Sequence, residues 1–184
     1  YEEPLVKPFT TIEEHNYEKF TKDNVHDFRD TITPTNTIPT KIFAGFKKAY
    51  HDKYKFDTKT EKDLAIILEG DKAVLKWLRP SRRQFKIYWD RNSRQYHPDF
   101  VAETKDTIYL IETKKEGDIE TSDVQEKATA AIKYCNHATE FNLSHGKKSW
   151  KYVLIPHNAV LANMGFDTLM KKYEQGPVYE KGRI

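Results

Sequence analysis

The sequence predicts an α/β fold in which a central mixed β-sheet is flanked by helices. From residue 58 onward, stretches with apolar residues at helical spacing alternate with short stretches typical of β-strands. The expected order is one helix, three strands, a helix, a strand and a final helix. Strands that follow one another directly favour antiparallel pairing, whereas a strand, helix and strand in succession favour a crossover, so the sheet is expected to be mixed. The 184 residues are enough for one domain with a substantial core.

The first 57 residues give weaker signals. They are rich in threonine, asparagine, proline and charged residues, and we expect 1–57 to be an extension or linker that packs on the following domain or ends a preceding one. Prolines predict an extended Thr31–Thr40, and the spacing of Phe43 and Phe46 predicts a short helix over Lys41–Tyr54. Because the chain starts with a tyrosine, we interpret it as a piece of a longer protein.

Residues 58–184 form the predicted main domain. Leu64, Leu68 and Leu75 lie near helical spacing within Thr58–Leu78, which Gly70 interrupts. The later elements are expected to be strands at Gln84–Trp89, Arg94–Glu103, Thr107–Lys114 and Trp150–Pro156, and helices at Ser122–His137 and Ala159–Glu174.

The composition excludes several classes of protein. The chain has a single cysteine, Cys135, so a disulfide framework is impossible and a reducing compartment such as the cytoplasm is expected. No apolar run has the length of a membrane span, and no signal peptide is visible, so no membrane partner is expected. The formal net charge of +3 is too small to identify a nucleic-acid partner by itself.

A local concentration of positive charge is more informative than the net charge. The stretch from Lys76 to Arg94 contains seven lysines and arginines and only one acid, Asp90. Such a stretch is typical of a surface that contacts nucleic-acid phosphates, and equally of a solvated face. The candidate DNA contacts within it are Arg79, Arg82, Arg83, Arg91 and Arg94.

Two carboxylates interrupt the apolar strands of the predicted hairpin around Lys105-Asp106. Asp99 begins one run and Glu112 lies inside the next. If the turn is at Lys105-Asp106, antiparallel pairing places Asp99 directly opposite Glu112. Like charges at this separation repel, so one carboxylate must take up a proton or a cation must bind between them.

A divalent cation would give this pair a chemical use. Mg²⁺ prefers carboxylate and backbone oxygens, and the Thr113 carbonyl is a further candidate ligand. The strand period of two places Lys114 on the same face as Glu112. This set fits phosphodiester hydrolysis, in which Lys114 orients the attacking water or stabilises negative charge. The alternative interpretation is a surface hairpin in which Lys114 neutralises an acid.

The proline–aspartate pair, the strand, the turn and the Glu-x-Lys strand together resemble the PD-(D/E)xK nuclease superfamily. The matching residues are Pro98, Asp99, Glu112, Thr113 and Lys114. With the flanking stretches, residues 43–173 are similar to the C-terminal endonuclease domain of the Res subunit of type III restriction enzymes. The resemblance implies that 58–184 is a nuclease domain with a restriction-endonuclease-like core and metal-dependent deoxyribonuclease activity.

The resemblance also implies cofactors and partners. Asp99 and Glu112 would ligate Mg²⁺, with Mn²⁺ as a substitute, and Lys114 would be the catalytic lysine. ATP would act only through a helicase-like motor region of the same longer chain, to which 1–57 would be the linker. The partners would be double-stranded DNA and a modification (methyltransferase) subunit, in the cytoplasm of a prokaryote.

Three further residues match positions that join the site in some members of the superfamily: Glu61, Gln125 and Lys127. Each has a second interpretation. Glu61 follows Thr58 in a capping box, and Gln125 follows Ser122 in another, so both side chains could serve only the start of a helix. Lys127 could be an ordinary solvated lysine.

Three functions remain open on the sequence. The leading hypothesis is the cleavage domain of a type III restriction enzyme Res subunit. A junction resolvase, a repair nuclease or a transposon-end nuclease of the same superfamily would share the chemistry and differ in substrate. A non-catalytic DNA-binding module with the same fold is the third. In each case the arginines would contact the duplex backbone without specifying sequence.

Overall fold

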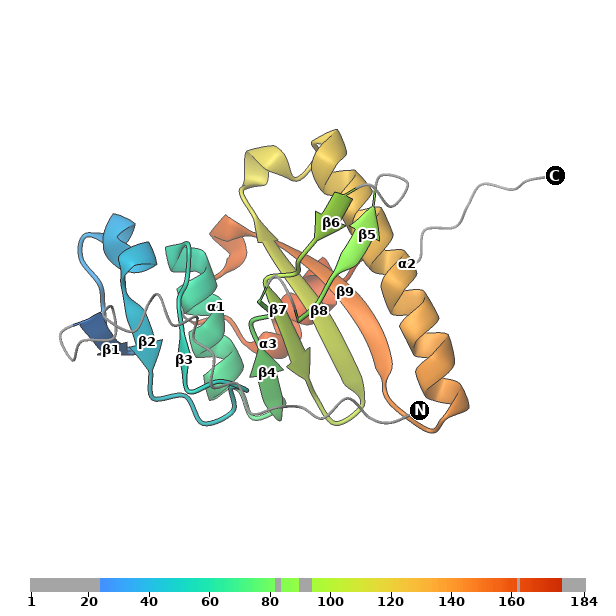
Figure 1. Cartoon of the computed structure of the whole chain (residues 1–184), viewed down its shortest axis with the longest axis horizontal. Helices are drawn as coiled ribbons and strands as arrows, with labels where there is room; N and C mark the ends of the chain where they lie inside the picture. Colours follow the sequence, from blue (N-terminus) through green and yellow to red (C-terminus); the bar gives the residue numbers. More distant parts are fainter. Residues whose placement is uncertain (1–23, 82–83, 90–93, 162, 177–184) are drawn as a thin grey trace.

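A four-stranded mixed sheet forms the centre of the protein (Figure 1). The computed structural model describes residues 24–81, 84–89, 94–161 and 163–176. The strand order is β4-β7-β8-β9; β4, β7 and β8 pair antiparallel, and β8 and β9 pair parallel. The strands are β4 (Lys76–Leu78), β7 (Phe100–Glu103), β8 (Thr107–Lys114) and β9 (Ser149–Pro156). The predicted α/β class with a mixed sheet is therefore confirmed.

Helices cover both faces of this sheet. Helices α1 (Lys59–Gly70) and α3 (Phe166–Tyr173) pack on one face. Helix α2 (Ser122–Ser144) packs on the other, together with a two-stranded ribbon of β5 (Ile87–Trp89) and β6 (Arg94–Tyr96). In Figure 1 the ribbon and α2 lie side by side.

The central strand explains why both faces need cover. In β8 the side chain of Leu110 contributes to the core under α2, and that of Ile111 to the core under α1 and α3. Both residues are fully buried. A strand covered on both sides has apolar residues in succession rather than in alternation, which is why this strand was recognisable in the sequence.

The N-terminal part of the described chain differs from its prediction. The helix predicted over 41–54 is wrong: the chain forms β2 (Ile42–Ala44) and β3 (Lys53–Tyr54), and β1 (Val25–Asp27) pairs with β2. Gly45 follows β2 with a φ of +92°, a backbone conformation that breaks a helix and that only glycine adopts without strain.

This part nevertheless shares its core with the rest of the protein. Phe43 and Phe56 are fully buried and belong to the same apolar cluster as α1 and Phe100. The segment predicted to be extended over 31–40 contains a 3-10 helix, Thr35–Thr40, so that prediction is wrong for these six residues. Pro39 is tolerated because the i→i+3 hydrogen bonds from Thr37 to Pro34 and from Lys41 to Ile38 do not require its missing N–H.

Two other segments differ in part from their predictions. The predicted interruption at Gly70 is confirmed, because helix α1 ends there, but the apolar residues that follow it build β4 and not a second helical segment. Asp71 ends the helix because its carboxylate accepts hydrogen bonds from the N–H groups of Ala73 and Phe166. The strand predicted over 94–103 is two strands, β6 and β7, separated by residues 97–99.

None of the helices in the described ranges is both long enough and apolar enough to cross a membrane.

Candidate functional site

The acidic residues of the predicted hairpin meet where β7 begins and β8 ends. Phe100, the first residue of β7, pairs with Ile111 in β8. This is the register expected from a turn at residues 105 and 106, and it is confirmed. Asp99 and Glu112 are the next residues beyond this last pair, and the charge of Asp99 acts on Glu112.

Asp99 is fixed by the strand opposite it. Its Oδ2 accepts a hydrogen bond of 2.8 Å from the Thr113 N–H and another of 2.8 Å from the Thr113 hydroxyl. Thr113 is buried, so the two hydrogen bonds that it donates to Asp99 lie largely away from solvent. The other carboxylate oxygen, Oδ1, remains to bind a ligand.

The strand pairing ends just before Thr113. The last pair of β7 and β8 is Phe100 with Ile111, and beyond it the Thr113 N–H bonds the Asp99 carboxylate. Pro98, next to Asp99, has no N–H and cannot donate to a carbonyl of β8. The Thr113 carbonyl is therefore the backbone oxygen that we consider as a ligand here.

Glu112 is held by two hydrogen-bonding partners in the interior. Its side chain is only 6% exposed. The Lys114 ammonium lies 2.8 Å from Oε1, and the Tyr96 hydroxyl donates to Oε2 at 3.0 Å. A second buried tyrosine, Tyr152 of β9, is hydrogen-bonded to the side chain of Tyr96.

The electrostatics follow from this burial. Burial, and after it the charge of Asp99, raises the pKa of Glu112 to about 8, although Lys114 and Tyr96 lower it. Burial also opposes the charge of Lys114, but the Glu112 carboxylate outweighs it and the pKa of Lys114 is raised. Without a cation, Glu112 therefore holds a proton near neutral pH. A cation between Asp99 and Glu112 would stabilise the charged form instead.

The oxygen atoms gathered here fit a hard divalent cation. Asp99 and Glu112 supply carboxylates whose oxygens keep further lone pairs beyond the hydrogen bonds described, and the Thr113 carbonyl supplies a third ligand. Over the described part of the chain, no group of three or more His, Cys, Asp or Glu side chains is arranged to hold a metal ion. Two carboxylates and a backbone carbonyl would therefore be the protein's contribution, with water completing the coordination.

Glu61 lies near the cluster but has other partners. Its side chain accepts a hydrogen bond from the Asp57 N–H at 2.7 Å and forms an ion pair with Arg79 at 2.9 Å. Burial is the largest cause of its raised pKa, and Asp99 is among the charges that add to it. Thr58 also caps α1, as its hydroxyl accepts from the Glu61 N–H at 3.1 Å. The charge of Asp99 therefore acts on Glu61, and Glu61 also accepts a hydrogen bond at the start of its own helix.

The structure does not bring Gln125 into contact with the cluster. Its amide donates to the Ile119 carbonyl at 2.8 Å. The predicted capping box of α2 is wrong, because Thr121 is the N-cap residue and the Ser122 hydroxyl bonds Glu126 instead.

Lys127 is paired within its own helix. Its ammonium contacts Asp123 and lies 5.1 Å from the centre of the Trp89 ring. Asp123 is also one of the charges that raise the pKa of Lys114, so Lys127 is near the cluster through this shared neighbour.

The candidate DNA contacts separate into three groups. Arg82, Arg83 and Arg91 lie outside the described residues. Arg79 turns inward, where its guanidinium pairs with Asp57 at 2.8 Å and with Glu61. Arg94 is exposed and lies 5.3 Å from the centre of the Trp89 ring, on the side of the sheet that carries Glu112.

Sequence reasoning missed Tyr96 and Tyr152. Tyr96 comes three residues before Asp99, but only the fold of β6 turns its hydroxyl to Glu112. Tyr152 lies on the same strand face as Leu154, so a strand period of two indicates burial but not the partner. A polar aromatic residue in an otherwise apolar strand is the one signal that could have drawn attention to it.

Comparison with known proteins adds no family assignment to this geometry. A scan against protein-family models, a search of curated proteins and a search of solved structures found no match. The candidate site therefore rests on the arrangement of Asp99, Glu112, Thr113 and Lys114.

Proposed function

We propose that the chain is a Mg²⁺-dependent DNA endonuclease domain with a restriction-endonuclease-like core. The observation that supports this most directly is the buried Glu112, which is close enough to Asp99 to be affected by its charge and contacts Lys114 at 2.8 Å. A buried carboxylate beside a like charge is costly unless it holds a proton or a cation. Strongly perturbed acids of this kind are characteristic of catalytic sites.

Each residue then has a distinct task. Asp99, Glu112 and the Thr113 carbonyl would hold Mg²⁺ or Mn²⁺, which supplies Lewis-acid activation of the phosphodiester and of a water molecule. Lys114 would place its ammonium beside the reacting phosphate and stabilise the negative charge that develops there. The Thr113 hydroxyl and N–H keep Asp99 in position. Glu61 would act from the neighbouring helix on the charge balance of Asp99.

The proposed substrate and partners follow the sequence resemblance. Double-stranded DNA would meet exposed cations near the site, among them Arg94, which also pairs with Asp123 at 3.9 Å. The domain would serve as the cleavage part of a type III restriction enzyme Res subunit in a prokaryotic cytoplasm. ATP and the modification subunit would act through a motor region of the longer chain. Another nuclease of the same superfamily would use the same residues on a different DNA structure.

The test is divalent-ion-dependent cleavage of plasmid DNA by the purified chain. The wild type should nick plasmid with Mg²⁺ or Mn²⁺ and be inactive with EDTA. The variant Asp99→Ala should be inactive under all conditions while keeping its melting temperature within a few degrees. Asp106→Ala, in the turn of the same hairpin, is the matched acidic control and should cut normally.

One observation favours a non-catalytic module instead. The Lys114 ammonium lies 2.8 Å from the Glu112 side chain, a contact that a purely structural pair would also make. If the wild type binds DNA but does not cut it with any divalent ion, the non-catalytic function is the better explanation.

A further inference from the structure

A groove lies between β5 and α2, on the same side of the sheet as Glu112. Figure 1 shows these two elements side by side. Its volume is about 770 Å³, which is large enough for more than one nucleotide unit. Lysines, tyrosines and small polar side chains predominate in its lining, which includes Lys86, Tyr88, Gln125, Thr129, Lys133 and Tyr134.

The β5 wall presents an aromatic ring and a cation on one strand face. Lys86 and Tyr88 are both exposed, while Ile87 and Trp89 between and after them are buried against α2. The strand period of two therefore turns the lysine and the tyrosine to the same side. An exposed ring next to an ammonium group can stack on a nucleobase while the cation contacts the adjoining phosphate.

The α2 wall complements the β5 wall. Residues 122, 125, 126, 129 and 133 recur at helical spacing and form one polar stripe along the groove. Lys133 adds a second cation. Glu126, the acid in the lining, is hydrogen-bonded to the Ser122 hydroxyl at 2.9 Å. The positive groups of the lining thus outnumber the negative one.

Two residues of the groove lining connect it to neighbours of the candidate site. Trp89 lines the groove, and Arg94 and Lys127, which both pair with Asp123, lie over its ring at 5.3 and 5.1 Å. Ile87, also in the lining, pairs across the ribbon with Tyr96, which bonds Glu112. A strand that lay in the groove would therefore lie beside the ribbon that contacts Glu112.

We propose that this groove binds one unpaired strand of DNA next to the bond to be cut, with a base stacked on Tyr88 and phosphates on Lys86 and Lys133. The inference rests on the proposed nuclease function and names its substrate class: DNA with a single-stranded segment at the cleavage site. A continuous duplex keeps its bases stacked inside and leaves Tyr88 without a base to contact.

The test measures DNA binding separately from cleavage. Fluorescence anisotropy with EDTA present would compare a labelled oligothymidine of about 12 nucleotides with a duplex of the same length. Tyr88→Ala should weaken binding of the single strand about tenfold, the loss expected for one stacked base, and change duplex binding less than twofold. Lys86→Glu should weaken single-strand binding as well.

The matched control is Tyr50→Ala. Tyr50 is 50% exposed and Tyr88 is 49% exposed, but Tyr50 lies between β2 and β3, outside the groove lining. No loss in Tyr88→Ala, or an equal loss for duplex and single strand, would overturn the groove assignment. The assignment would also be overturned if the wild type does not bind the oligonucleotide, or if Tyr50→Ala loses as much single-strand affinity as Tyr88→Ala.

Cleavage with Mg²⁺ separates this inference from the proposed function. Single-strand binding that depends on Tyr88, without cleavage of any DNA, would support the groove and refute the nuclease. Cleavage of duplex DNA by a protein whose single-strand binding does not depend on Tyr88 would support the nuclease and refute the groove. Faster cleavage of a forked DNA than of a duplex, lost in Tyr88→Ala, would support both.

Discussion

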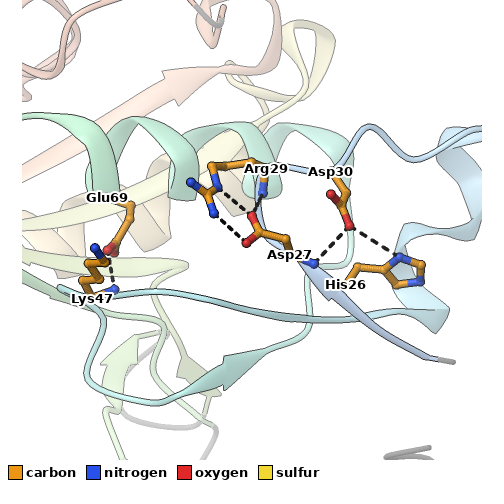
Figure 2. A network of polar contacts seen from close by, with 6 residues as sticks. All are labelled: His26, Asp27, Arg29, Asp30, Lys47 and Glu69. Carbon is orange, nitrogen blue, oxygen red and sulfur yellow. Dashed lines mark hydrogen bonds and ion pairs between the residues drawn. The ribbon is translucent and has the colours of Figure 1, made fainter. Parts of the chain in front are cut away.

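The half-buried carboxylate of Glu69 and the buried one of Glu112 have opposite kinds of surroundings. Glu69, in the last turn of α1, accepts hydrogen bonds from the Trp77 indole N–H at 2.9 Å and from the Lys48 N–H at 3.0 Å. It also accepts one from the Lys47 N–H, which Figure 2 shows. All of these partners are donors. Glu112 has Lys114 and Tyr96 as donors but also the like charge of Asp99.

The exposed acids near β1 extend the same contrast. Figure 2 shows Asp27 paired with Arg29 through two side-chain contacts, at 2.7 and 2.8 Å, and Asp30 between His26 and the Asp27 N–H. The hydrogen bonds from Arg29 hold the pKa of Asp27 well below its usual range. Burial and a like charge raise that of Glu112.

This difference shows how a site is distinguished from a structural network. Hydrogen-bond donors surround the carboxylates of Asp27 and Glu69, so these side chains need no further ligand. Glu112 has its charge opposed by burial and by Asp99, so it gains most from a proton or a cation. Four substitutions test whether the two kinds of carboxylate differ in this way, the largest expected effect first.

Replacement of Lys114 should give the largest effect. Lys114→Met keeps the length of the side chain and removes the ammonium, so the cleavage rate at saturating Mg²⁺ should fall about 10³-fold. Initial rates on plasmid DNA measure this. Lys151→Met removes a lysine that pairs with Glu174 at 3.0 Å elsewhere on the sheet and should cut at the wild-type rate. Equal cleavage rates for the two variants would show that Lys114 has only a structural role.

The pH dependence of stability should identify Glu112 next. Its pKa of about 8 in the folded protein lies above the ordinary value of 4.5. The folded state therefore holds the proton more tightly than the unfolded state, and the contribution of Glu112 to stability falls as pH rises from about 4.5 to 8. In EDTA, the wild type should lose roughly 3 kcal/mol relative to Glu112→Gln between pH 5 and pH 8.

Chemical denaturation of both proteins at the two pH values measures this difference. Added Mg²⁺ should restore the wild type at pH 8 and leave Glu112→Gln unchanged, because only the wild type has the second carboxylate. Parallel pH profiles for the two proteins would show that Glu112 is ionised in the folded state throughout and would contradict this prediction.

Glu69 should affect stability and not chemistry. Glu69→Ala leaves the indole N–H of the buried Trp77 and two backbone N–H groups without their acceptor. We expect a loss of about 2 kcal/mol in the free energy of unfolding and a cleavage rate per folded molecule within twofold of the wild type. A loss of cleavage without a loss of stability would contradict the division between the two carboxylates.

The sequence predicts the central elements well because their signals are local. β8, β9 and α2 have apolar patterns of the correct period, and the turn at residues 105 and 106 determines the register of β7 and β8. The 41–54 segment was predicted wrongly because Phe43 and Phe46 have a helical spacing, whereas Gly45 and pairing with β1 favour strands.

The candidate site is predictable only in part, because some of its contacts join segments that are distant in the sequence. The strand period brings Glu112 and Lys114 to one face, and the hairpin adds Asp99. The inward turn of Arg79 depends on Asp57 and Glu61, and the contact of Tyr96 with Glu112 depends on where the β5–β6 ribbon packs. These contacts join segments whose relative positions no local pattern determines.

The Tyr96 contact therefore deserves a direct test, although its expected effect is the smallest. Tyr96→Phe removes the hydroxyl that donates to Glu112 at 3.0 Å and keeps the buried ring. Groups that orient a metal ligand typically contribute about tenfold to metal affinity. The Mg²⁺ concentration for half-maximal cleavage should therefore rise about tenfold, while the rate at saturating Mg²⁺ changes much less.

Tyr109→Phe provides the control for this change, because Tyr109 packs against Phe166 on the opposite face of the sheet. It should leave the Mg²⁺ dependence of cleavage unaltered. If Tyr96→Phe behaves in the same way, Lys114 and the strand alone orient Glu112. If it shifts the Mg²⁺ dependence as expected, the donors around Glu112 differ in kind from those around Glu69: they aim a carboxylate at a ligand, whereas the donors of Glu69 only saturate it.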